Sequence, residues 1–318
     1  MKRAVCIVTL VMLAQGCGSL GSTFRAATPE PTPIAAARPT LAPRELAFTW
    51  LGAAGVLVRT QNQTVAVDPY VTRANIVRTV IGSLRSDTKA VDRWIPKVDL
   101  ILVGHSHADH VLDVPYLARR DNAPVVGSLT TSSIAQTYGT AKELIHVIGG
   151  GERLSLNGIT VHSVKAGHGT WILPKVTTPG VLVNPEPGPL RGPDFKMGGA
   201  FFYRFTVDGI RVGHLSSGAL AKGMPKDLDV DVLFVSLAAS KDKQAVLEKI
   251  LASTHPAVVV PIHFDLFFMG LEQTPRRLPG YDPSETALAV STLEPKATTI
   301  IPDPMREVVV NVDTRKYR

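Results

Sequence analysis

The sequence predicts an α/β layered fold, and three observations lead to that prediction. Short apolar runs typical of strands alternate with segments of helical pattern along residues 46–318. Three of these runs end directly in a histidine, at His105, His168 and His263. Both cysteines of the 318-residue chain, Cys6 and Cys17, lie near its start. A disulfide framework, a cysteine metal site and a catalytic cysteine are thereby excluded from the body, whose chemistry must use oxygen and nitrogen side chains.

Residues 1–17 (MKRAVCIVTLVMLAQGC) predict a secretory signal. Lys2 and Arg3 give a basic start, and the apolar stretch that follows is shorter than the about 20 residues of a transmembrane span. Gly16-Cys17 resembles a bacterial lipoprotein signal, in which Cys17 would be lipidated and become the new N-terminus. An ordinary secretory signal with an unmodified Cys17 is the alternative. Either reading predicts export, and Gly18 favours the outer membrane or periplasmic side in a Gram-negative cell.

Residues 18–45 predict an extended linker, because 18–43 hold five prolines among small residues. No second linker divides residues 46–318, so a single folded domain is expected there. The formal net charge of +7 falls to +5 without Lys2 and Arg3, and no basic run occurs. Nucleic acid is therefore not expected as a partner. The sequence leaves the oligomeric state open.

The elements of the body follow from apolar runs and the turns between them. Residues 46–60 and 63–70 are two strand-like runs joined by the polar turn 61–63, and Asp208-Gly209 marks a hairpin. Further strands are expected within 98–105, 159–168, 198–207, 210–216, 230–237 and 257–264. Helices are expected at about 109–119, 129–138, 242–254 and 284–293.

The first strand that ends in a histidine is followed by a cluster of metal-binding side chains. His105-Ser106-His107-Ala108-Asp109-His110 packs four potential ligands into six residues. Imidazole and carboxylate are ligands that Zn²⁺ accepts. A chain that turns from a strand into a helix can direct His105 and His107 at one ion, and Asp109 and His110 at a second. A polar loop with coincidental histidines is the alternative, which the chain's nine histidines make improbable.

This His-x-His-x-Asp-His motif resembles that of the metallo-β-lactamase superfamily of hydrolases. Trp50-Leu51-Gly52, Val67-Asp68-Pro69, Lys165–Gly169 and Val260–Asp265 resemble motifs of the branch that contains ascorbate-6-phosphate lactonase and N-acyl-phosphatidylethanolamine phospholipase D. Four motifs in the expected order are more specific than one. The resemblance covers nearly all of 46–318 and implies an αββα four-layer sandwich.

Carried over position by position, the resemblance implies two sets of metal ligands. His105, His107 and His168 would hold one ion, and Asp109, His110 and His263 the other. The expected cofactor is zinc, as one or two ions, with manganese and iron left open. Metal-assisted hydrolysis is implied, in which the metal activates water. His107 and Asp109 would be essential to turnover, and Asp109 would orient the attacking oxygen.

One position departs from the superfamily pattern. The acid that normally bridges the two ions is absent after the hairpin, where the chain reads Val212–Gly218 with His214, Ser216 and Ser217. Three accounts are open. His214 replaces the acid as a ligand, with a purely structural role as the alternative; a serine contacts a metal-associated water; or the second metal site is weak or empty.

The surroundings of the centre are also predicted. Asp68 and Asp265 are candidates to accept the outer N–H of a ligand histidine, with turn and solvated-loop roles as alternatives. The long segments Trp171–Met197, with six prolines, and Asp265–Asp282 are expected to form the pocket wall. In the second segment, Phe267, Phe268, Met269 and Tyr281 would bind an apolar group of the substrate, with packing beneath the loop as the alternative. Arg276 and Arg277 would bind an anionic group.

The leading functional interpretation is an exported, membrane-tethered metal-dependent hydrolase of an ester, lactone, amide or phosphodiester. Its partners would be a small-molecule or lipid-like substrate and, through the lipid anchor, a membrane. The alternative is a non-catalytic metal-binding module that lost turnover with its bridging acid.

Overall fold

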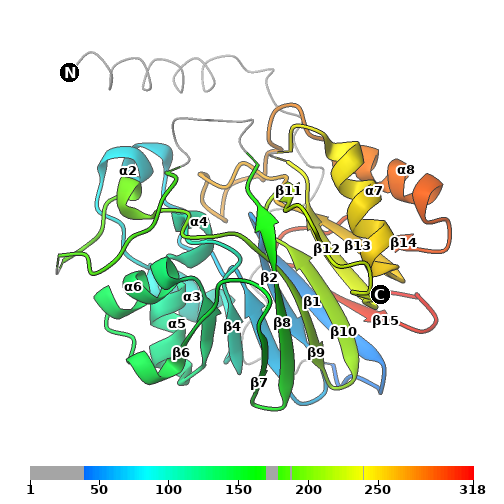
Figure 1. Ribbon diagram of the computed structural model, residues 1–318, viewed down its shortest axis with the longest axis horizontal. Helices are drawn as coiled ribbons and strands as arrows, with labels where there is room; N and C mark the ends of the chain where they lie inside the picture. Colours follow the sequence, from blue (N-terminus) through cyan, green and yellow to red (C-terminus); the bar gives the residue numbers. More distant parts are fainter. Residues whose placement is uncertain (1–38, 170–177, 187, 239) are drawn as a thin grey trace.

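The computed structural model describes residues 39–169, 178–186, 188–238 and 240–318 (Figure 1). The predicted signal peptide with Cys17, most of the linker, and Trp171 of the predicted pocket wall lie outside these residues. Within the described part of the chain, no helix has the length and apolar character needed to cross a membrane. The first strand begins at Glu45, one residue before the predicted start of the body.

The first sheet has the order β15-β1-β2-β3-β4-β5-β6. Its strands are β1 (Glu45–Gly52), β2 (Gly55–Arg59), β3 (Thr64–Val67), β4 (Leu100–Leu102), β5 (Val125–Gly127), β6 (Ile145–Val147) and β15 (Glu307–Asn311). The run predicted as one strand over 46–60 is thus a hairpin. Gly52 (φ 80°) and Ala53 (φ 45°) turn the chain back, so that Trp50 pairs with Val56.

The second sheet has the order β11-β8-β9-β10-β12-β13-β14, with β7 paired to β8. Its strands are β7 (Arg153–Leu156), β8 (Ile159–Gly167), β9 (Phe201–Val207), β10 (Ile210–Leu215), β11 (Ala219–Leu220), β12 (Val232–Ser236), β13 (Val258–Ile262) and β14 (Thr298–Thr299). The hairpin predicted at Asp208-Gly209 is confirmed: both residues have positive φ, and Val207 pairs with Ile210.

Helices cover the outer face of each sheet. The first sheet carries α2 (Ile76–Ile81), α3 (Thr88–Trp94), α4 (Ala108–Val111), α5 (Val114–Asp121) and α6 (Leu129–Thr137), with the 3₁₀ turns η1 (Lys142–Leu144) and η2 (Gly192–Asp194) nearby. The second carries α7 (Lys243–Thr254) and α8 (Pro283–Leu293). Figure 1 shows the two helical groups on opposite sides of the paired sheets, which confirms the αββα order.

The two-residue period of a strand explains how one sheet serves two cores. On β3, Val65 and Val67 belong to the cluster between the sheets, whereas Ala66 belongs to the cluster beneath α3–α6. Both sets are fully buried. Strand β3 is therefore apolar on both faces, and the polar residue Asp68 comes directly after its end.

The helix predicted over 109–119 is interrupted, because α4 ends at Val111 and α5 begins at Val114. Pro115 lies in the first turn of α5, where its missing N–H has no helical partner to lose. The break leaves α4 as a single turn, and that turn carries Asp109 and His110. Helices α2 and α3 were not predicted.

Candidate metal centre

The motif from His105 to His110 begins shortly after the end of β4, a strand of the first sheet. Gly104 follows β4, and its N–H donates to Asp68 Oδ1 at 2.6 Å. A Cβ at this position would lie 1.7 Å from Ser216 Oγ, so only glycine fits. Two residues further on, Ser106 is buried, and its hydroxyl lies 3.0 Å from Ser128 Oγ and 2.8 Å from Thr131 Oγ1. The loop that carries the histidines is thus fixed on both sides of His105.

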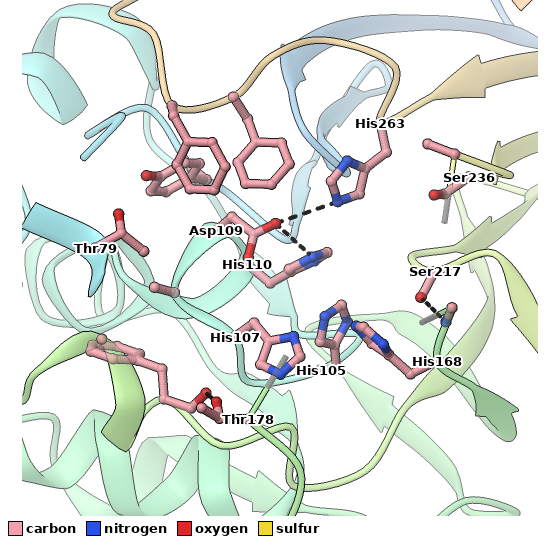
Figure 2. A pocket seen from close by; sticks show the side chains of 18 of the residues that line it. Thr79, His105, His107, Asp109, His110, His168, Thr178, Ser217, Ser236 and His263 are labelled. Carbon is pink, nitrogen blue, oxygen red and sulfur yellow. Dashed lines mark hydrogen bonds and ion pairs between the residues drawn. The ribbon is translucent and has the colours of Figure 1, made fainter. Parts of the chain in front are cut away.

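The predicted ligands lie together in two groups. In His105, His107 and His168, one ligand atom from each side chain lies within 4.8 Å of the others, and the same holds for Asp109, His110 and His263. His168 follows β8 and His263 follows β13, so strand ends of both sheets meet here. Figure 2 shows the six side chains converging on one pocket.

Asp109 is the only carboxylate among the six. Its Oδ2 lies 3.3 Å from His110 Nε2 and 3.4 Å from His263 Nε2 (Figure 2). Burial raises the pKa of Asp109, but charge attraction to His110 and the contacts with both histidines outweigh burial and hold this pKa well below its usual range. Asp109 is therefore ionised at neutral pH.

His110 differs in protonation from the three histidines of the first group. Burial, followed by repulsion from His107 and His110, lowers the pKa of His168 to about 3, and similar causes lower the pKa values of His105 and His107. Burial also lowers the pKa of His110, but Asp109 and Asp68 together raise it to about 10. The histidines of the first group are neutral at pH 7, the form in which imidazole binds a metal, whereas His110 is protonated.

The residues present fit a metal ion. Each group offers three nitrogen or oxygen donors within the spacing that one cation needs, and the donors are those that zinc and similar metals accept. His105 Nδ1 and His263 Nδ1 are buried without a hydrogen-bond partner in the described part of the chain. Such orphaned nitrogens are uncommon in folded proteins, so these rings carry bonding capacity that the described residues do not use.

Asp68 lies behind His110, as the sequence predicts for a residue that supports a ligand. Its Oδ2 lies 2.9 Å from His110 Nδ1, on the side of the ring away from Asp109. Its other oxygen accepts from the Gly104 N–H, and the side chain is fully buried. A carboxylate in this position fixes the orientation of the imidazole and strengthens it as a ligand.

Asp265 makes different contacts from those predicted. Its Oδ2 pairs with Arg73 Nη1 at 2.7 Å, and its Oδ1 accepts from the Ala53 N–H at 2.7 Å. It is buried, which also excludes the solvated-loop alternative. The strong charge of Arg73 next to it explains why it binds the guanidinium and not a histidine.

His214, Ser216 and Ser217 lie in the segment where the superfamily has its bridging acid. The first two belong to the protein core, and the third lines the pocket. His214 lies outside both groups; its Nε2 donates to Ala54 O at 2.9 Å, so its Nδ1 is free to accept from Ser216 Oγ at 3.3 Å. Both side chains are buried. Ser217 does line the pocket, where its Oγ accepts from the Gly169 N–H at 3.0 Å (Figure 2).

Both long segments contribute to the pocket wall, as predicted. Thr178, Gly192 and Phe195 come from the first, and Phe267, Phe268 and Leu278 from the second. The two arginines do not line this pocket: Arg276 lines a separate cavity, and Arg277 pairs with Asp282 at 2.8 Å. Met269 lines that second cavity, and Tyr281 is buried against Thr286.

Sequence reasoning did not identify several residues of the site. Tyr70, Thr79, Ser236 and Ala238 line the pocket, and Arg73 anchors Asp265. Tyr70 directly follows the Val67-Asp68-Pro69 motif, which was the one available signal. The others lie in segments without a motif.

Comparison with known proteins agrees with this geometry. Residues 47–263, more than half of the chain, match the family model of the beta-lactamase superfamily domain. A UPF0173 metal-dependent hydrolase of Pelotomaculum thermopropionicum is 25% identical over 252 residues, which cover 78% of this chain and 96% of the relative. A second UPF0173 metal-dependent hydrolase, from Bacillus thuringiensis, is 26% identical over 228 residues, which cover 69% of this chain and 86% of the relative.

Solved structures share the fold at low sequence identity. A metallo hydrolase from Ignicoccus hospitalis has a TM-score of 0.56 at 17% identity and covers 83% of this chain and 98% of its own. A possible metal-dependent hydrolase from Veillonella parvula has a TM-score of 0.52 at 14% identity, and the match covers 82% of this chain and 98% of that protein. On the match to the family model, the chain belongs to the metallo-β-lactamase superfamily.

Proposed function

We propose that this chain is a metal-dependent hydrolase whose reaction takes place at the two ligand groups. The observation that carries this proposal is the convergence of six donor side chains, from strand ends of two sheets, in one pocket. Structural metal sites are usually closed by four protein ligands. Each group here has three and opens onto the pocket, which leaves room for water and substrate.

The side chains of the pocket have distinct tasks in such a reaction. A metal held by these groups would polarise the carbonyl or phosphoryl oxygen of the substrate and would lower the pKa of water. His105, His107 and His168 are the neutral donors of the first group. Asp109, ionised and facing the pocket, is positioned to accept a hydrogen bond from a water molecule and to orient it. Asp68 fixes the ring of His110 from behind.

Zinc is the cofactor we propose, because imidazole-rich sites with one carboxylate suit it. Manganese and iron are the alternatives that a reconstitution series would separate. The substrate would be an ester, lactone, amide or phosphodiester, in keeping with the motifs that resemble the lactonase and phospholipase D branch.

The N-terminal pattern supports a further proposal on location. The basic start, the apolar stretch and Gly16-Cys17 support export and a lipid anchor on Cys17, which would tether the body to a membrane, on the periplasmic side in a Gram-negative host. Expression in a bacterium fed radiolabelled palmitate tests this proposal. The label is expected on the full chain and absent from a Cys17→Ser variant.

The hydrolase proposal is tested with nitrophenyl esters and bis(nitrophenyl) phosphate. Hydrolysis of at least one of them is expected to disappear on chelation and to return with added Zn²⁺. His107→Ala and Asp109→Ala should each lower the rate by at least about a hundredfold without unfolding the chain. His255→Ala is the matched control, because this exposed histidine pairs only with Asp229 among the contacts described. Full activity in both site variants would contradict the proposal.

A further inference from the structure

Apolar side chains form part of the pocket wall, and two of them lie beside His263. Phe267 and Phe268, in the loop after β13, have ring centroids 4.4 Å apart. The Phe267 ring meets the His263 imidazole edge to face at 5.1 Å. Both phenylalanines are half-buried, so part of each ring faces the pocket. The remaining apolar side chains that line the pocket, and that complete the apolar wall, are Tyr70, Ala108, Phe195, Ala238 and Leu278.

The described arginines near the pocket are directed elsewhere. Among the described residues that line it, none is a lysine or an arginine. Arg73 is neutralised by Asp265 and lines the separate cavity that Arg276 also lines. Arg277 pairs with Asp282. Away from the ligand groups, a charged part of a substrate would leave water without gaining a counter-charge from the described residues, which is unfavourable.

The threonine hydroxyls of the wall are already engaged. Thr79 Oγ1 donates to Asn75 O at 3.0 Å, and Thr178 Oγ1 donates to Phe195 O at 2.7 Å. The Tyr70 hydroxyl accepts from the Ala74 N–H at 2.8 Å. Because both threonine protons are donated to the backbone, a sugar-like group with many hydroxyls would find few donors along this wall, and the other aliphatic hydroxyls of the pocket are those of Ser217 and Ser236.

We infer that the substrate is a carboxylic ester or lactone whose acyl part is uncharged and apolar. The acyl chain lies along Phe268 and the other apolar wall residues, while the carbonyl faces the ligand groups. This inference rests on the proposed hydrolytic function and narrows its substrate class. It removes sugar phosphates and substrates with an anionic acyl tail.

Two measurements on the metal-loaded protein test the inference. The first compares kcat/KM for nitrophenyl acetate, butyrate, hexanoate and the mono-nitrophenyl ester of adipic acid, which adds a charge to the end of the six-carbon chain. We expect a rise on the order of threefold for each buried methylene, and a loss of at least tenfold for the adipate ester. The second measures binding of hexanamide and of adipic acid monoamide by calorimetry, with tighter binding of hexanamide expected.

The outcomes separate this inference from the function on which it rests. Hydrolysis of acetate without a gain for hexanoate, or with equal rates for hexanoate and the adipate ester, overturns the inference and leaves the hydrolase proposal intact. No metal-dependent hydrolysis of any ester, together with preferential binding of hexanamide, supports the apolar pocket and counts against the function. Equal binding of both amides overturns the inference even without turnover.

A pair of variants assigns the effect to the wall. Phe268→Ala should lose five- to tenfold more kcat/KM on hexanoate than on acetate. Phe267 is not used, because its ring contacts His263. Leu288→Ala is the control, since this side chain is 71% exposed on α8. It should leave the dependence on chain length unchanged, and an equal flattening in both variants overturns the inference.

Discussion

Arg73 and Asp265 form a buried ion pair that holds the end of the strand carrying His263. Nη1 and Oδ2 lie 2.7 Å apart, and the two side chains are only 4% and 6% exposed. Asp265 Oδ1 accepts from the Ala53 N–H, and Ala53 O in turn accepts from the His263 N–H at 2.8 Å. His263 adopts a positive φ of 61°, which a non-glycine residue rarely does without such support.

Replacing Asp265 should therefore affect both stability and metal binding. Asp265→Asn leaves the guanidinium of Arg73 buried without a counter-charge, which costs about 3–5 kcal/mol of unfolding free energy. It also loosens His263, so the second equivalent of metal should bind at least tenfold more weakly, while the first is unchanged. Denaturant unfolding and metal titration followed by calorimetry measure the two effects.

The chain offers a matched control for this substitution. Arg93 and Glu272 form an ion pair of the same length, 2.7 Å, but their side chains are 48% and 75% exposed. Glu272→Gln should cost less than about 1 kcal/mol and leave metal binding unchanged. Equal losses in both variants would show that the pair at Asp265 has no particular role in placing His263.

Gly104 is required by the close approach of β4 to Ser216. In Gly104→Ala the new Cβ would lie 1.7 Å from Ser216 Oγ and 3.0 Å from Asp68 Oδ2. We expect a loss of about 2–3 kcal/mol in unfolding free energy and weaker binding of the second metal, because Asp68 supports His110. Gly104→Ala with Ser216→Gly should recover part of the stability. Gly270→Ala is the control, since nothing lies within 4 Å of its Cβ position.

Sequence reasoning found the cluster from His105 to His110 because these residues are contiguous, so residue type and spacing indicate a metal site. His168 and His263 each follow an apolar strand, and their assignment came from the resemblance to the superfamily motifs. The partner of Asp265 lies 192 residues away, and no local pattern encodes such a pairing. The strands β5 and β6 have three residues each, which is too short to show alternation. Helix α2 has no buried residue, so it shows no apolar stripe.

His214 is expected to act on stability and not on metal content. Its ring is fully buried and its Nε2 donates to Ala54 O, so His214→Ala leaves a cavity and an unpaired carbonyl. The expected cost is about 2–4 kcal/mol, with the metal content after dialysis unchanged. His255→Ala should change neither quantity. Loss of one metal equivalent from a variant of normal stability would instead assign His214 as a ligand.

The two ligand groups should respond differently to pH. Because Asp109 and Asp68 raise the pKa of His110 to about 10, a metal that binds the second group must displace a proton at any pH below that value. Its apparent affinity should then fall about tenfold for each unit of pH decrease between pH 9 and 6. The first group has no such competitor in this range, since the pKa of His168 lies at about 3.

Calorimetry in two buffers of different ionisation enthalpy measures this difference as protons released per metal bound. The second equivalent should release one proton at pH 7.5, and the first none. The second group has one carboxylate and lacks a bridging acid, so it should also lose its metal on dialysis at pH 6 while the first keeps its own. Asp68→Asn lowers the pKa of His110 and should reduce the protons released at pH 8.5. Equal proton release for both equivalents, or two full equivalents retained at pH 6, would contradict this assignment of the proton to His110.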